Sequence, residues 1–134
     1  MAIANWSSRF ETGITVIDTQ HKELFEAINA FADSFKSGTS SSQVKESLAF
    51  LLKYTIEHFE TEEKLMREMC YPRLAEHAAA HAELAQESLD LATSVKNGNF
   101  VTMDVAVFVA DWLLHHIYNM DMDYVAFARS LESV

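Results

Sequence analysis

The residues best suited to chemistry in this chain are five of its six histidines, together with two carboxylates. The histidines fall on the apolar stripes of the helices that the sequence predicts, and the carboxylates lie beside them. Burying an unpaired imidazole costs about 1–3 kcal/mol, so a cluster of them needs a partner, and a shared metal centre is the simplest one. The candidate metal ligands are His21, His58, Glu62, His77, His81, His116 and Asp121.

Two pairs of these ligands have the spacing of neighbours on one helix face, and a third pair does not. His58 and Glu62 are four residues apart, as are His77 and His81, and this spacing places both members of a pair on one face of a helix. Asp121 follows His116 by five residues, which turns it about 140° away in a regular helix. Either the helix carries a π-type bulge, which is common at functional sites, or Asp121 is not a ligand.

Five imidazoles and two carboxylates exceed the capacity of one metal ion, whereas two ions that share bridging carboxylates fit the count. Imidazole suits Zn, Cu, Fe and Ni. Carboxylate-rich di-iron bundles use more glutamates, whose negative charge better supports highly oxidised iron. A histidine-rich pair of ions therefore favours milder chemistry, such as reversible O₂ binding. With both carboxylates and one oxygen bridging two octahedral ions, one coordination position stays open for a small ligand.

Apolar residues that recur at steps of three and four predict four helices with short connections. We expect these helices at about 18–37, 41–70, 73–96 and 102–131. Asp18 or Thr19 is expected to cap the first helix. Residues 1–15 show no clear period and are expected to form an extended N-terminal arm, held to the bundle by Trp6 and Phe10.

Short connections make neighbouring helices antiparallel, so the expected fold is an all-α, up-down-up-down four-helix bundle. No linker divides the 134 residues, which indicates a single domain over 1–134. Counted from the loops that they share, the histidines of neighbouring helices lie at similar distances along the bundle. All four helices are therefore expected to bring their ligands to one layer.

Apolar residues next to these ligands are expected to wall the pocket for a small ligand and to keep water out. They are Leu24, Phe59, Trp112, Leu113 and Ile117. His115 lies one position off the inner face of its helix and is expected to face solvent. Cys70 is the only cysteine, so no intrachain disulfide can form, which fits a reducing compartment.

The charge and hydropathy of the chain exclude several classes of partner. A net charge of −10 argues against binding nucleic acid or anionic lipid. No apolar run approaches the roughly 20 residues that span a membrane, and the N-terminus lacks the features of a signal peptide. We therefore expect a cytoplasmic protein, and the sequence identifies no protein partner.

Taken together, the ligand motifs resemble those of the hemerythrin family. The matching segments are Ile17–His21, His58–Glu63, His77–His81 and Trp112–Ile117, with Asp121 five residues after His116. The resemblance extends from Trp6 to about Tyr124 and leaves none of the family's ligand positions empty. It implies a four-helix bundle that binds O₂ reversibly at a non-haem di-iron centre, with Fe²⁺ and Fe³⁺ states and a bridging oxo or hydroxo group.

The resemblance also implies a role for each ligand. His77, His81 and His116 would hold one iron, while His21 and His58 would hold the other iron, which keeps the open position. Glu62 and Asp121 would bridge the two irons, so the family's spacing favours Asp121 as a ligand.

Other functions on the same scaffold remain possible at this stage. They are a di-iron oxidase or peroxidase, an enzyme that handles nitric oxide, and the O₂- or iron-sensing domain of a larger signalling protein. The lack of an acid or base near the open position argues against an enzyme. Zinc as the native metal and a metal-free helical interaction module are further alternatives.

Overall fold

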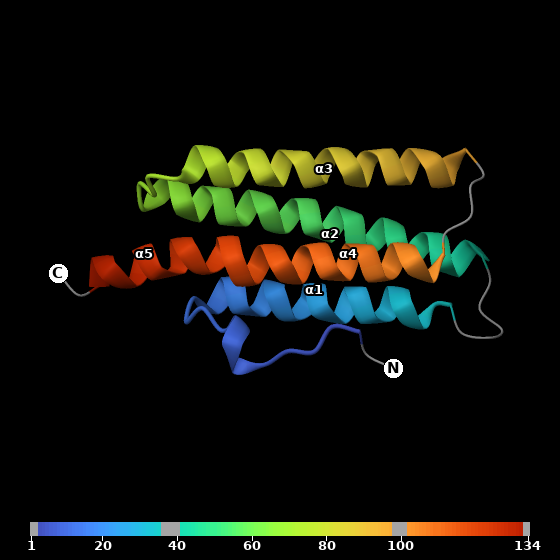
Figure 1. Ribbon diagram of the computed structural model, residues 1–134, viewed down its shortest axis with the longest axis horizontal. Helices are drawn as coiled ribbons and strands as arrows, with labels where there is room; N and C mark the ends of the chain where they lie inside the picture. Colours follow the sequence, from blue (N-terminus) through green and yellow to red (C-terminus); the bar gives the residue numbers. More distant parts are fainter. Residues whose placement is uncertain (1–2, 36–40, 98–101, 133–134) are drawn as a thin grey trace.

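The computed structural model describes residues 3–35, 41–97 and 102–132, and the described residues form helices, turns and an N-terminal arm without strands. The long helices lie side by side as an up-down-up-down bundle (Figure 1), which confirms the predicted fold. They are α1 (Thr15–Asp33), α2 (Ser41–Glu68), α3 (Leu74–Lys96), α4 (Met103–His116) and α5 (Met122–Glu132). Helix α1 packs against α2 and α4, and α2 also packs against α3.

The last helical stretch of the bundle runs from α4 through α5 and is not one regular helix; we call it the fourth rod. A π-helical segment, Ile117–Asp121, joins α4 to α5 without a break in direction (Figure 1). A π turn adds one residue to the helical repeat, and Asp121 is therefore rotated relative to its place in a regular helix.

The N-terminal arm lies along α1 and is held by the predicted Trp6 and Phe10 and by an amide side chain that the sequence did not predict. The ring of Phe25 contacts Trp6 and Phe10, with centroids 5.3 and 5.1 Å away. The Asn29 side chain accepts hydrogen bonds from two backbone N–H groups of the arm, those of Ile3 and Ala4, at 2.9 Å. The arm also contains one 3₁₀ turn, Ser8–Phe10.

The predicted cap of the first helix is wrong. Helix α1 begins at Thr15, and its N-cap residue is Ile14, whose side chain cannot cap. Asp18 instead lies inside the first turns of the helix and accepts hydrogen bonds from the backbone N–H of Thr12 (2.8 Å) and of Gly13 (3.2 Å). Its carboxylate therefore holds the chain before the helix, rather than the first N–H groups within it.

Helix α1 ends at Asp33, earlier than the predicted residue 37, and the predicted end near Gly38 lies outside the described residues. Helix α2 ends in a Schellman motif. The Tyr71 N–H donates to the Met66 carbonyl (2.9 Å), and the Cys70 N–H donates to the Arg67 carbonyl (3.1 Å). Cys70 has φ +56°, a conformation that usually favours glycine.

Among the residues that the structure describes, the core consists of two apolar clusters. The larger cluster includes Phe31, Leu51 and Leu113, and the smaller one surrounds Met66 and Tyr124. Along α2, α3 and the fourth rod, the predicted ligands lie between residues of the larger cluster and residues of the smaller one. The ligands therefore form a polar layer within the core.

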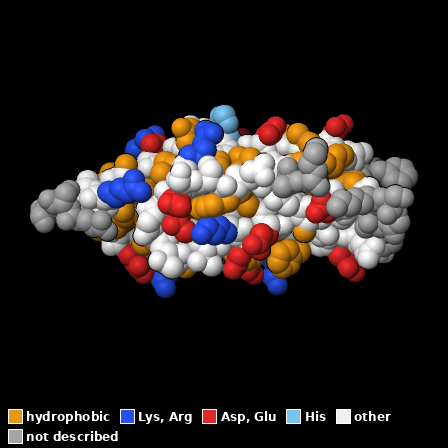
Figure 2. Space-filling view, turned by 90° about the horizontal axis from the view of Figure 1, so that it is seen from below, with side chains coloured by type: hydrophobic (Ala, Val, Ile, Leu, Met, Phe, Trp, Pro, Cys, Tyr) orange, Lys and Arg blue, Asp and Glu red, His pale blue; other side chains and the backbone are white. Residues whose placement is uncertain are grey.

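Charged and apolar side chains are interspersed on the face of the bundle shown in Figure 2. None of the helices in the described part of the chain combines the length and hydrophobicity that crossing a membrane requires.

Candidate metal centre

The structure brings all seven predicted ligands together, as two groups that overlap. In each group, the donor atoms lie within 4.8 Å of one another. The first group contains Glu62, His77, His81, His116 and Asp121. The second group contains His21, His58, Glu62 and Asp121, so the two carboxylates belong to both.

These side chains are buried although all of them are polar. The most exposed is His116, at 5%, while His21, Glu62 and Asp121 are completely buried. They come from α1, α2, α3, α4 and the π-helical segment. Their convergence in one layer agrees with the layer predicted from loop distances.

The carboxylate of Asp121 lies between the two groups. Its Oδ1 is 3.0 Å from His77 Nε2 and 3.1 Å from His116 Nε2, both in the first group. Its Oδ2 is 3.2 Å from His21 Nε2, in the second group. One oxygen therefore faces each group, which is the arrangement that a bridging carboxylate needs.

Glu62 also contacts both groups, but through a single oxygen. Its Oε1 is 3.3 Å from His58 Nε2 and 3.4 Å from His81 Nε2, one nitrogen from each group. Its Oε2 is 3.6 Å from His21 Nε2 and accepts a hydrogen bond of 2.6 Å from the Tyr124 hydroxyl.

The π-helical segment explains the awkward spacing of Asp121. The spacing left two alternatives, a helix with a π-type bulge or an Asp121 that is not a ligand. The structure has the bulge, and it places the Asp121 carboxylate in the same layer as His116.

Several polar atoms of this layer have no hydrogen-bond partner within the described part of the chain. They are His21 Nδ1 and Nε2, His58 Nε2, Glu62 Oε1, and Asp121 Oδ1 and Oδ2. Leaving a buried polar group unpaired costs about 1–3 kcal/mol. All but His21 Nδ1 point into the space between the imidazoles and carboxylates, so cations bound there would pair them. The residues present therefore fit a metal centre.

The pKa values of the layer reflect the mutual pairing of its charges. Burial lowers the pKa of His21, but the nearby carboxylates of Asp121 and Glu62 outweigh this effect and raise the pKa to about 9. Burial and the Glu62 charge raise the pKa of Asp121, but the three imidazoles close to its oxygens outweigh them and lower it to about 2. Burial likewise raises the pKa of Glu62, and the surrounding histidines, His58 foremost, hold it well below its usual value. Both carboxylates are thus ionised at neutral pH, as metal ligands must be.

Outer partners of the ligands were missed by the sequence analysis. The Nδ1 of His58 lies 2.6 Å from Gln20 Oε1, and the Nδ1 of His81 lies 3.0 Å from Glu63 Oε2. These oxygens can only accept, so each Nδ1 carries a proton and donates, and the ring is oriented with its Nε2 toward the layer. The only signal in the sequence was that Gln20 and Glu63 directly adjoin predicted ligands.

Tyr124 was also missed, and its hydroxyl fixes the orientation of the shared Glu62 carboxylate. It lies one turn after Asp121, in the smaller apolar cluster. Because it is fully buried and lies beside two carboxylates, its pKa is raised well above the usual value. The hydroxyl therefore remains protonated and donates.

Two of the five predicted pocket residues stack on ligand histidines. Phe59 lies parallel to His81, with centroids 3.9 Å apart, and Trp112 lies parallel to His116, at 5.1 Å. Leu24, Leu113 and Ile117 are at most 1% exposed and belong to the larger apolar cluster. The layer is thus walled by apolar side chains on the side of that cluster.

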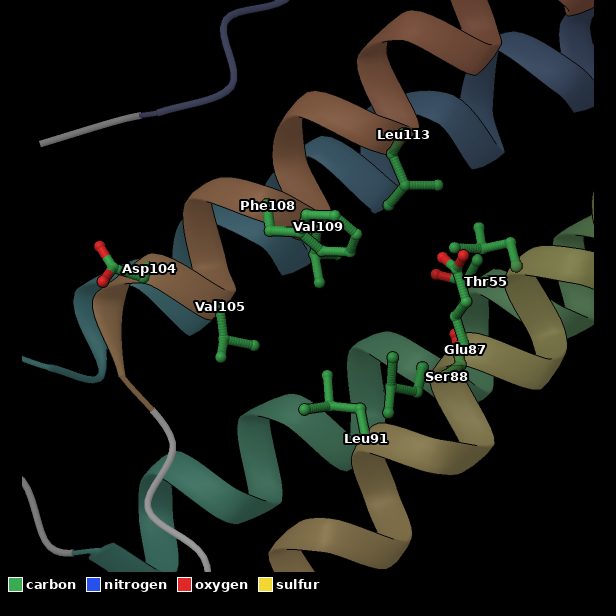
Figure 3. A pocket seen from close by; sticks show the side chains of 11 residues that line it. Thr55, Glu87, Ser88, Leu91, Asp104, Val105, Phe108, Val109 and Leu113 are labelled. Carbon is green, nitrogen blue, oxygen red and sulfur yellow. The ribbon is translucent and has the colours of Figure 1, made fainter.

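A cavity of about 260 Å³ lies between α2, α3 and α4 (Figure 3), and none of the seven candidate ligands lines it. Leu113 lines it, together with Thr55, Ser88 and several aliphatic side chains. Trp112 lies elsewhere, in a surface hollow of about 420 Å³ that it shares with His115 and His116. His115 is exposed, as predicted.

The chain is similar in sequence and in fold to hemerythrins. Residues 12–128 match the protein family described as the hemerythrin HHE cation binding domain. The chain is 33% identical to a bacteriohemerythrin of Methylococcus capsulatus over 126 residues, which cover 92% of this chain and 95% of the relative. It is 34% identical to a hemerythrin-like protein of Naegleria gruberi, covering 90% and 89%. A crystal structure of wild-type hemerythrin superposes with a TM-score of 0.88 at 32% identity, covering 93% of this chain and 97% of the other.

Proposed function

Because this chain belongs to the hemerythrin family, we propose that it binds O₂ reversibly at a non-haem di-iron centre. One observation carries the proposal: two buried groups of donors share Glu62 and Asp121, with donor atoms within 4.8 Å of one another in each group. Two such groups with common carboxylates suit a pair of adjacent ions better than one ion.

In this proposal, His77, His81 and His116 hold one iron, and His21 and His58 hold the other. Glu62 and Asp121 would be shared by both irons, together with an oxo or hydroxo group. Bound iron would supply the electrons that O₂ takes up reversibly. The group with two histidines offers one protein ligand fewer than the group with three, so it would leave room for O₂.

The protein's own part is to hold the ligands and to exclude water. Gln20 and Glu63 accept hydrogen bonds from the Nδ1 atoms of His58 and His81 and so orient these rings, and Tyr124 orients Glu62. We propose binding rather than catalysis, because the buried walls formed by Leu24, Leu113 and Ile117 offer no acid or base to a bound molecule. Action in the cytoplasm and the absence of a nucleic-acid partner stay predictions from the sequence.

Reversible oxygenation is the direct test. Protein loaded with Fe²⁺ without air should gain a visible charge-transfer band when O₂ is added, lose it under vacuum, and regain it over repeated cycles. Zinc-loaded protein is the matched control and should show no band. Irreversible oxidation in the first cycle would reject the proposal, and turnover of peroxide or nitric oxide faster than autoxidation would favour an enzyme.

A further inference from the structure

We propose that the two metal positions are unequal in affinity and fill in order, and that Glu63 and Gln20, outside the ligand set, contribute to this difference. The position of His77, His81 and His116 fills first, and the position of His21 and His58 fills second. The inference rests on the two-metal centre proposed above and concerns the residues that support its ligands.

The donor sets are the first reason for the inequality. Both positions share Glu62 and Asp121, so the carboxylates do not distinguish them. The difference is the number of imidazoles, which is three in the first group and two in the second. An additional imidazole nitrogen favours binding of a divalent ion such as Zn²⁺ at the first position.

The outer hydrogen bonds act in the same direction. His81 Nδ1 lies 3.0 Å from the Glu63 carboxylate, whereas His58 Nδ1 lies 2.6 Å from the neutral Gln20 amide. The amide contact is shorter, but a hydrogen bond to an ionised group is roughly twice as strong as one between neutral groups. A carboxylate behind a histidine also makes the imidazole a stronger donor to a cation. Glu63 therefore strengthens the first position, and Gln20 provides no comparable charge at the second.

The rings are also held unequally. At the first position, Phe59 stacks on His81, and Trp112 stacks on His116. At the second position, His21 Nδ1 has no hydrogen-bond partner within the described part of the chain. An imidazole that is already held loses less conformational freedom when an ion binds, so the first position is the better prepared of the two.

Zinc titration of the metal-free protein tests the order. Zn²⁺ is a suitable probe because it binds imidazole and carboxylate without redox chemistry. Calorimetry should resolve two binding steps, the first at least about tenfold tighter, since support by outer residues is typically worth 10–100-fold in metal affinity. With ¹⁵N-labelled histidine and one Zn²⁺ per chain, the Nε2 signals of the three histidines at the first position should shift, while those of His21 and His58 stay near their metal-free positions.

Two substitutions assign the difference to the outer residues. Glu63→Gln should weaken the first step by about 10–100-fold and leave the second nearly unchanged. Gln20→Glu should raise the zinc affinity of the second step and so reduce the difference in affinity between the two steps. Glu60→Gln is the matched control, because it removes the same charge from an exposed position in the same turn of α2, and it should change neither step.

Several results would overturn the inference. These are two zinc-binding steps of equal affinity, NMR signals of His21 and His58 that shift before those of the other three histidines, or an effect of Glu60→Gln on zinc affinity that equals that of Glu63→Gln. Circular dichroism of each metal-free variant checks that it folds. If Glu63→Gln does not fold, Gln20→Glu decides the assignment, and an unchanged second step there would contradict it. Loss of reversible oxygenation with ordered zinc binding intact would instead reject the proposed function alone.

Discussion

The polar ligand layer and the larger apolar cluster beside it are equally buried, yet they are stabilised in different ways. In the apolar cluster, side chains such as Phe31 and Leu51 are completely buried among other apolar groups, and burial itself stabilises them. In the layer, His21, Glu62 and Asp121 are just as buried, but some of their polar atoms are unpaired. The apolar cluster therefore needs no ligand for its stability, whereas the unpaired polar atoms of the layer need cations as partners.

Loss of a ligand should give the largest effect and should act mainly through the loss of metal binding. We expect His81→Ala to lower the iron content and to remove most of the stabilisation by metal, which is about 4 kcal/mol when free metal is 1,000 times its Kd. Iron analysis and chemical denaturation with and without metal measure both. The control is His115→Ala, an exposed histidine, which should change neither. Unchanged iron stoichiometry in His81→Ala would contradict the assignment.

A deletion in the apolar cluster should show the opposite pattern. Leu51 is completely buried, so Leu51→Ala should cost about 3 kcal/mol through lost burial and the cavity left behind. The loss should be the same in metal-free and iron-loaded protein, with iron content unchanged. Leu89→Ala, at an exposed leucine, should cost little. If Leu51→Ala also removed iron, the two regions would not be energetically separate.

The pH dependence of stability should also separate metal-free from loaded protein. In the metal-free protein, the pKa of His21 is raised from 6.5 to about 9. A raised pKa stabilises the fold fully below pH 6.5, and this stabilisation is lost as pH rises towards 9. The loss over that window is about 3 kcal/mol at most, at 1.36 kcal/mol per pKa unit.

Urea denaturation of metal-free protein between these pH values measures the loss. Iron-loaded protein should lack it, because an ion replaces the proton on His21. Metal-free His21→Gln should lack it as well. Equal pH profiles for the metal-free wild type and this variant would show that His21 is not the group responsible.

The smallest expected effect lies outside both regions, at the C-terminal end of α2. Cys70 has φ +56°, and a left-handed conformation costs about 1 kcal/mol for a residue with a Cβ atom. Cys70→Gly should therefore raise the free energy of unfolding by up to about 1 kcal/mol, with iron content unchanged. Cys70→Ala retains the Cβ and should bring no gain, and an equal gain in both variants would rule out backbone strain as the cause.

The same two regions show how much of the site could be predicted from sequence. The five ligand histidines lie on the apolar stripes of their helices, so helical periodicity and loop lengths were sufficient to bring them to one layer. Asp121 could not be placed in this way. Its position depends on the π-helical segment, and no residue type in the sequence specifies that an extra residue enters the helical repeat.

The outer partners depend on contacts between helices, which periodicity does not specify. Gln20 on α1 reaches His58 on α2, and Glu63 on α2 reaches His81 on α3. Helical periodicity gives the face on which each side chain lies, but not how two helices are rotated against each other. The predicted cap at Asp18 failed for a related reason: an acidic residue near a helix start satisfies either the helix or the chain before it, and here it binds the backbone of Thr12.

Diffraction from crystals of the iron-loaded protein, with anomalous data at the iron absorption edge, tests the central claim most directly. We predict two iron peaks about 3.5–4 Å apart, with Glu62 and Asp121 between them. One peak should lie against His77, His81 and His116, and the other against His21 and His58. A single peak, or iron bound away from these side chains, would contradict the account.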